Sequence, residues 1–141
     1  MPLRAIMDTN VFLNSLWSTR GAVFEIFAEL RRDRWQLVLS NHLLFEYEEV
    51  AKRHTAEMNL TLADVDDVLD ALCAAAEQHQ LAPTWIPVLS DPDDEPLLQM
   101  AVEAQVPFIV TRNTRHLNLA KTFGIEVLTP AEFLAKLRQN V

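Results

Sequence analysis

The sequence has 141 residues, of which 50% are hydrophobic, and this is about the size at which one domain builds one core. We therefore expect a single domain over residues 1–141. The formal net charge is −8, so the chain should stay in solution and repel phosphate groups unless a cation is bound locally. This charge counts against a protein that binds nucleic acid through a basic patch.

Two further features exclude other classes of protein. Only two glycines occur, so the chain cannot build a glycine-rich phosphate loop, and ATP-driven and NAD-dependent chemistry are excluded. The N-terminal segment has no long apolar run, and no later stretch reaches the roughly 20 residues that a membrane span needs. We expect a cytoplasmic protein that does not associate with a membrane.

Short apolar runs alternate with longer amphipathic stretches, which is typical of a parallel sheet covered by helices. We predict an α/β fold with three layers, α/β/α, and a central parallel sheet of four to five strands. The expected strands cover residues 3–7, 36–39, 108–111 and 126–128, and a short strand at 85–88 is allowed within the proline-rich loop 82–92. The expected helices cover residues 21–33, 41–54, 61–79, 94–105, 114–122 and 130–139.

Asp8 directly follows the first apolar strand and begins the polar run Asp8-Thr9-Asn10. It should therefore lie at the carboxyl end of that strand, which is the edge where parallel sheets bind ligands. All three residues are also good helix N-caps. Both interpretations remain open on this evidence.

Glu46 lies in the expected helix 41–54, whose apolar residues Leu43, Tyr47 and Val50 define an inward face. Glu46 falls on that same face. A buried carboxylate costs several kcal/mol unless it is paired or bound to a metal. The alternative is a position at the edge of the face, where Glu46 reaches water or a buried arginine.

The third group of acids is the run from Asp91 to Pro96, just before an expected helix. Proline is tolerated only where a helix amide is unbonded, so Pro96 confines the helix start to about residues 94–96. Asp94 then lies in the first turn and points to the core side. The helix dipole stabilises acidic residues near a helix N-terminus. This effect accounts for the presence of Asp93 or Glu95 better than for that of Asp94.

A fourth polar segment, Thr111 to His116, follows the expected strand that begins at Phe108. Asn113 is a candidate ligand here, although it would also serve as a helix N-cap. His116 is another candidate ligand, but a lone histidine next to the apolar Leu117 is more often a packed or surface residue.

Together, Asp8, Glu46, Asp94 and Asn113 would form one oxygen-rich pocket without a Cys or His pair. Hard oxygen ligands favour Mg²⁺ or Mn²⁺ over zinc. A divalent ion there would cancel the repulsion among the carboxylates, recruit a phosphodiester and lower the pKa of a bound water. The pattern thus predicts hydrolysis of phosphodiester bonds.

At these residues the chain resembles PIN-domain proteins, and more closely the toxin components of bacterial toxin–antitoxin systems related to VapC ribonucleases. The resemblance covers nearly the whole chain. The segments that carry it are Met7 to Val11, Leu43 to Tyr47, Asp91 to Ala101, Ile109 to Leu117 and Leu128 to Leu134. The first four of these segments are motifs that are specific when they occur in this order at suitable intervals, although any one of them alone is weak.

The resemblance implies a metal-dependent endoribonuclease with Asp8, Glu46, Asp94 and Asn113 as catalytic residues and metal ligands. Thr9, Asn10, Asp91 and Thr111 are expected to support the site, and Arg112 and Arg115 to bind substrate. The resemblance also implies a homodimer and inhibition by a small cognate antitoxin protein. Asn113 and His116 depart from the family, because many relatives have aspartate at these two positions, and we therefore expect one well-held ion in the free enzyme, with any second ion arriving with the substrate.

Two rival interpretations remain. A phosphoaspartyl phosphatase would need a second aspartate where this chain has Asn10, and a receiver domain would need a lysine that the segment 125–130 lacks. The more serious alternative is a catalytically degenerate PIN-fold module that binds RNA or protein. The three acids Asp8, Glu46 and Asp94 argue against such a loss.

Overall fold

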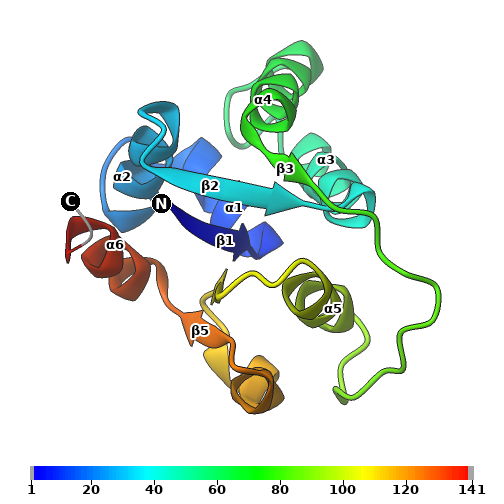
Figure 1. Ribbon diagram of the computed structural model, residues 1–141. Coiled ribbons are helices and arrows are strands. Elements are labelled where there is room, and N and C mark those ends of the chain that lie inside the picture. The colour runs from blue at the N-terminus through cyan, green and yellow to red at the C-terminus, as the bar shows by residue number, and fades with distance from the viewer. Residues whose placement is uncertain (1, 140–141) are drawn as a thin grey trace.

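The computed structural model describes residues 2–139 and shows a parallel sheet surrounded by helices (Figure 1). The strands are β1 Leu3–Met7, β2 Trp35–Leu39, β3 Glu77–Gln78, β4 Phe108–Val110 and β5 Glu126–Leu128. The α-helices are α1 Thr9–Trp17, α2 Ala22–Arg31, α3 Asn41–Arg53, α4 Leu62–Ala75, α5 Glu95–Glu103 and α6 Pro130–Gln139, and a 3-10 segment, η1, covers Thr114–Phe123.

All strand pairs are parallel, and the strand order across the sheet is β3-β2-β1-β4-β5. The chain thus builds one half of the sheet outward from β1, and then returns to β4 on the other side of β1. The order of strands reverses between β1 and β4, and such a switch point in a parallel sheet leaves a crevice at the carboxyl ends of the strands. The predicted fold class is confirmed.

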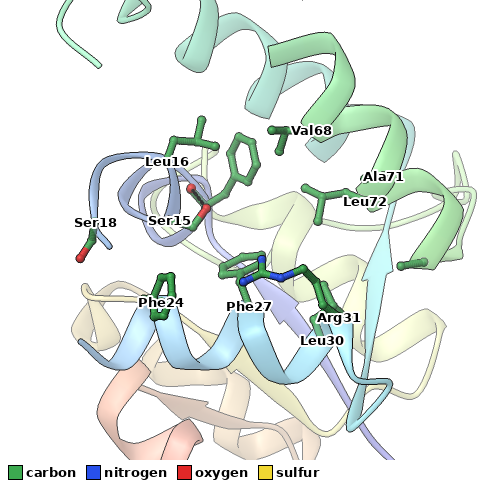
Figure 2. A pocket seen from close by; sticks show the side chains of 12 residues that line it. Ser15, Leu16, Ser18, Phe24, Phe27, Leu30, Arg31, Val68, Ala71 and Leu72 are labelled. Carbon is green, nitrogen blue, oxygen red and sulfur yellow. Dashed lines mark hydrogen bonds between the residues drawn. The ribbon is translucent and has the colours of Figure 1, made fainter. Parts of the chain in front are cut away.

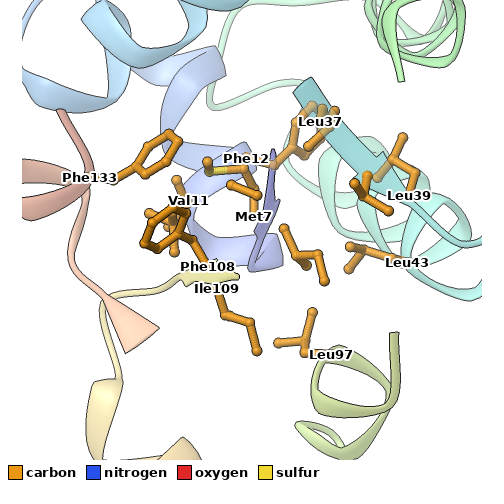
Figure 3. Packing of buried hydrophobic residues seen from close by; sticks show 14 of the residues in the cluster. Met7, Val11, Phe12, Leu37, Leu39, Leu43, Leu97, Phe108, Ile109 and Phe133 are labelled. Carbon is orange, nitrogen blue, oxygen red and sulfur yellow. The ribbon is translucent and has the colours of Figure 1, made fainter. Parts of the chain in front are cut away.

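Helices cover both faces of the sheet. Consecutive residues of a strand point to opposite faces, and Ala5, Ile6 and Met7 of β1 are all fully buried. On one side, Trp35 packs edge-on against Phe133 of α6, with ring centroids 5.3 Å apart. Figure 3 shows Phe133 beside Phe108 and Val11 in this part of the core. Apolar burial of this extent is the main force that holds the layers together.

The structure corrects the predicted elements at three places. Residues 9–17 form helix α1, which was not predicted. The helix expected over 61–79 ends at Ala75, and the chain continues into the edge strand β3. No strand forms at 85–88, because the amides of Val88 and Leu89 donate to the Glu95 carboxylate instead of to a neighbouring strand.

One face of α5 carries three polar residues, four positions apart, that hold the long segment between β3 and α5. The Glu95 carboxylate accepts from the Trp85 indole and from the two amides just named. One turn later, Gln99 donates to the carbonyl of Ala82 at 2.7 Å. Glu103 accepts from the Ala82 amide at 3.0 Å and lies 2.9 Å from His79. These contacts fix a segment that has no regular structure of its own.

An apolar groove of about 310 Å³ opens between α1, α2 and α4. Figure 2 shows Leu16 of α1 and Val68 of α4 on one side of it, and Phe24 and Phe27 of α2 on the other. Arg31 also lines this groove, and it makes no ion pair within residues 2–139. Within the same residues, no helix has the length and apolar character to cross a membrane.

Candidate metal centre

The carboxyl ends of β1 and β4 meet at the switch point of the sheet, and one side chain from each strand end contacts the other. Asp8 follows β1, and its amide donates to the carbonyl of Val110 at 2.9 Å, which extends the pairing with β4. The Thr111 hydroxyl, almost fully buried, donates to Asp8 Oδ2 at 2.7 Å. The Asp8 side chain makes no capping bond to α1, so its carboxylate is oriented by Thr111.

Glu46 reaches the same end of the sheet from helix α3. The buried hydroxyl of Thr9, the residue after Asp8, donates to Glu46 Oε1 at 2.5 Å. Tyr47, next to Glu46, donates its hydroxyl hydrogen to the carbonyl of Met7. Its ring stacks on Phe12, with centroids 4.3 Å apart and an interplanar angle of 11°. Helix α3 is thereby docked onto the end of β1, with Glu46 beside the Asp8-Thr9 turn.

Burial of the Tyr47 hydroxyl, and then the nearby carboxylates of Asp8 and Glu46, raise the pKa of Tyr47 well above its ordinary value. The phenol is therefore neutral at physiological pH and can act as a hydrogen-bond donor. Its proximity to both carboxylates indicates that Asp8 and Glu46 approach the same region.

The third group of side chains comes from the start of α5 and from η1. One ligand atom from each of Asp91, Asp94 and His116 can be chosen so that all three lie within 4.8 Å of one another. His116 Nδ1 is 3.5 Å from Asp94 Oδ2. Asp94 is the N-cap residue of α5, but its side chain makes no capping bond. The Asp94 carboxylate thus faces this cluster and not its own helix.

The charge of the Asp94 carboxylate is poorly stabilised in this position. Its Oδ2 atom is buried and has no hydrogen-bond partner within the described residues. Burial raises the pKa of the Asp94 carboxyl, the charges of Asp91 and Asp8 raise it further, and His116 opposes the shift. A buried polar atom without a partner requires an explanation, and a bound cation supplies one.

The remaining predicted site residues lie at the rim. Arg112, Asn113 and Arg115 are exposed, and together with Thr114 and His116 they line a pocket of about 370 Å³. The backbone amide of Asn113 donates to the Thr111 hydroxyl at 3.1 Å, and the Asn113 side chain makes no capping bond to η1. Asn10 is exposed on α1. The structure therefore joins Asp8 to Thr111 and Glu46 to Thr9 through hydrogen bonds, and leaves Asn10, Arg112, Asn113 and Arg115 exposed.

Three residues make contacts in or beside the candidate site that their sequence context did not indicate. Tyr47 was predicted as core, yet it also anchors the end of β1. Glu95 was explained by the helix dipole alone, whereas it is buried and accepts three hydrogen bonds. His116 gave no signal beyond its place in the fourth motif. Its grouping with Asp91 and Asp94 depends on how η1 packs on α5, which no local pattern reveals.

The residues present fit a divalent cation. Carboxylates from two parts of the chain lie near one another. Within residues 2–139, one carboxylate oxygen is buried without a hydrogen bond, and neither Lys nor Arg makes an ion pair with Asp8, Asp91 or Asp94. Oxygen-rich donor sets of this kind suit Mg²⁺ and Mn²⁺.

The parallel sheet covered by helices, with carboxylates near its switch point, defines the class as an α/β protein with an acidic site at the carboxyl ends of its strands. Within this class, the family model described as "PIN domain" matches residues 4–115. The chain belongs to the PIN-domain family.

The fold also resembles a solved chain in the crystal structure of VapBC2 from Rickettsia felis bound to a DNA fragment from their promoter. The TM-score is 0.61 and the sequence identity is 11%, over 90% of this chain and 98% of that one. At this identity the similarity bears on the fold. No curated protein sequence matches the chain.

Proposed function

We propose that the chain is a metal-dependent endoribonuclease that hydrolyses phosphodiester bonds in RNA. The observation that carries the proposal is the buried Asp94 oxygen without a hydrogen bond, which lies in an acidic cluster of a PIN domain. Asp8, Glu46 and Asp94 are proposed as the catalytic carboxylates and metal ligands. Asn113 contributes a neutral oxygen at the rim.

Each part of the site has a task in this proposal. Thr111 and Thr9 orient the Asp8 and Glu46 carboxylates through the hydrogen bonds described above. The exposed guanidinium groups of Arg112 and Arg115 attract the phosphates that flank the cleaved bond. A bound Mg²⁺ or Mn²⁺ would offset the carboxylate charges and lower the pKa of a bound water molecule. The choice of RNA as substrate follows the resemblance of the four motifs to VapC ribonucleases.

Cleavage of a mixed RNA pool tests this function. With Mg²⁺ or Mn²⁺ present, Asp8→Asn should lower the cleavage rate by about 10²-fold or more, because it removes a metal ligand and with it the activation of water. Asp93→Asn, an exposed member of the neighbouring acidic run, is the matched control and should keep full activity. Cleavage that resists EDTA, or an Asp8→Asn variant as active as the wild type, would contradict the proposal.

We further propose that the chain is the toxin of a toxin–antitoxin pair, acts in the cytoplasm and forms a homodimer. The similarity of its fold to a chain of the VapBC2 structure supports a two-component system. The occupant proposed for the apolar groove is the small antitoxin, with apolar side chains against Phe24 and Phe27 and an acidic residue for Arg31. This pairing is supported by the groove's apolar lining and by the absence of any other ion-pair partner of Arg31 in the described chain.

Co-expression with the small protein encoded next to this chain tests the partner. Expression of the chain alone should arrest growth, and the neighbouring protein should relieve the arrest. Arg31→Glu should weaken the complex by about tenfold or more, as the reversal of a charge at an interface does. Arg20→Glu, an exposed arginine outside the groove, should leave the affinity unchanged. If Arg31→Glu bound as tightly as the wild type, the groove would not be the docking site.

The second candidate is a PIN-fold module that has lost catalysis and only binds RNA or protein. Asn113 and His116 favour it, because each replaces an acid of many relatives. A titration with Mg²⁺ or Mn²⁺ separates the two candidates, since a preserved site should bind the ion and raise the melting temperature. No such rise would favour the binding module.

A further inference from the structure

His116 is the one imidazole in the candidate metal centre. It lies on η1, and its Nδ1 atom faces Asp94 Oδ2 across 3.5 Å. More than half of its side-chain surface is exposed, so its packing alone does not dictate that Nδ1 turn toward the site. The carboxylate opposite has an oxygen that is buried and accepts no hydrogen bond from His116 or any other described residue. Two potential ligand atoms thus face each other without a completed bond.

The spacing of these atoms suits a shared cation. Two ligand atoms on one ion lie about 3 Å apart when each metal bond is about 2.1 Å long and the angle is near 90°. A separation of 3.5 Å is therefore within reach of a small side-chain rotation. Asp91 supplies a third ligand atom within the same 4.8 Å cluster.

We propose that His116 is a metal ligand together with Asp91 and Asp94, and that its imidazole makes the centre bind Mn²⁺ in preference to Mg²⁺. This inference rests on the proposed function, because it concerns the same site. Mg²⁺ is a hard cation that prefers oxygen ligands and releases its water reluctantly. Mn²⁺ also accepts carboxylates, and as a first-row transition metal it accepts an imidazole nitrogen more readily than Mg²⁺ does. One nitrogen among the oxygens therefore shifts the balance toward Mn²⁺.

The preference can be measured without RNA and without any activity assay. Calorimetric titration of the metal-free protein should give a dissociation constant for Mn²⁺ at least about tenfold below that for Mg²⁺, or about 1.4 kcal/mol. His116→Ala should weaken Mn²⁺ binding by about tenfold or more and change Mg²⁺ binding by less than about threefold. His116→Asp, which offers an oxygen at the same place, should tighten Mg²⁺ binding and bring the two constants together.

His54→Ala is the matched control, because it removes an imidazole that pairs with Glu57 on the protein surface. His116 is exposed and His54 is partly exposed, and neither belongs to the core, so the circular dichroism of both alanine variants should match that of the wild type. The ratio of the two dissociation constants should be the same in His54→Ala as in the wild type.

A spectroscopic measurement reports the nitrogen itself. Electron spin echo measurements on the Mn²⁺-loaded protein should show the hyperfine coupling of a directly bound imidazole nitrogen. The coupling should disappear in His116→Ala and persist in His54→Ala. If the coupling is absent in the wild type, or persists in His116→Ala, His116 is not a ligand and the inference is overturned. RNA cleavage that requires Asp8 would still stand in that case, whereas loss of the ribonuclease proposal would leave the coupling unaffected.

Discussion

At the scale of single residues, Asp94 is an acid whose negative charge is disfavoured by its surroundings in the folded protein. Its carboxylate is 15% exposed, it lies near two other acids, and it gains no hydrogen bond at the helix end that it occupies. A folded-state pKa that is raised for an acid means that ionisation opposes folding. The contribution of Asp94 to the free energy of unfolding of the metal-free protein should therefore fall as the pH rises from the ordinary aspartate pKa through the raised pKa of Asp94.

Asp94→Asn removes this charge, and we expect the metal-free variant to be as stable as the wild type or more stable at pH 7. The substitution keeps the shape of the side chain and ends the repulsion from Asp91 and Asp8. Thermal unfolding in EDTA measures the difference in stability between the variant and the wild type, and Asp93→Asn is the control for loss of one charge in the same acidic run. A melting temperature lower by several degrees would mean that the contact with His116 is a structural salt bridge.

Bound metal should reverse the order of stability of the wild type and Asp94→Asn. With excess Mn²⁺ the wild type should gain stability in proportion to its affinity for the ion, and Asp94→Asn should gain less. Substitution of a residue with a purely structural role would not raise the melting temperature in EDTA and lower it, relative to the wild type, in Mn²⁺.

At the scale of elements, α5 has two tasks. Its apolar side packs on the sheet, while Glu95, Gln99 and Glu103 form a polar stripe that holds the segment 79–89. Asp91 lies two residues after this segment, and Asp94 directly precedes the helix. The polar stripe therefore also positions two of the acids of the candidate metal centre.

Glu95→Gln should destabilise the fold by about 2–3 kcal/mol, because an amide cannot replace a carboxylate that accepts three N–H groups. One donor would face the amide NH₂ and remain unpaired. Urea unfolding measures the loss. The control is Glu49→Gln, which alters only an exposed pair with Arg53 at 3.6 Å and should stay within about 0.5 kcal/mol of the wild type.

Glu103 gives the polar stripe a dependence on pH. Burial raises the pKa of the Glu103 carboxyl, but the hydrogen bonds with His79, with the Ala82 amide and with Gln99 outweigh it and lower the pKa. A lowered folded-state pKa contributes stability above the ordinary glutamate value, and this contribution disappears as the pH falls through the folded-state value.

Glu103→Gln should therefore be less stable than the wild type at pH 7, and the difference should shrink below about pH 4, where glutamate in the unfolded chain takes up its proton. Urea unfolding at several pH values between 7 and 3 gives the two curves. Parallel curves over the whole range would show that the Glu103 charge does not contribute to the stability of this segment.

At the scale of the whole molecule, four of the strands could be predicted because each is a short, mainly apolar run. The boundaries of β1 and β5 were predicted correctly, and β2 and β4 each differ by one residue. Strand β3 could not be predicted, since its two polar residues continue an alanine-rich helical pattern. It forms because His79 and its neighbours pair with the edge of β2 and because Arg4 binds Glu77.

Helix α1 was missed for a related reason. The polar run that begins with Asp8 was interpreted as a strand end or a helix N-cap, but no helix was predicted after it, although the nine residues from Thr9 carry a short amphipathic pattern. For the candidate site, position in the sequence could place Asp8 and Thr111 at strand ends. It could not show which threonine orients which carboxylate, or that His116 faces Asp94, because these contacts join residues up to 103 positions apart.

The two edges of the sheet have a consequence for how copies of this chain meet. Edge strands with free backbone groups are templates for aggregation, and short or charged edges discourage it. Here the outer strands are only two and three residues long, Glu77 on one is held by Arg4, and Glu126 on the other lies 3.6 Å from Lys136. Neither edge offers a long apolar ladder to a second sheet. Self-association of this molecule should therefore proceed through helix surfaces, which keeps the crevice between β1 and β4 clear of intermolecular strand pairing.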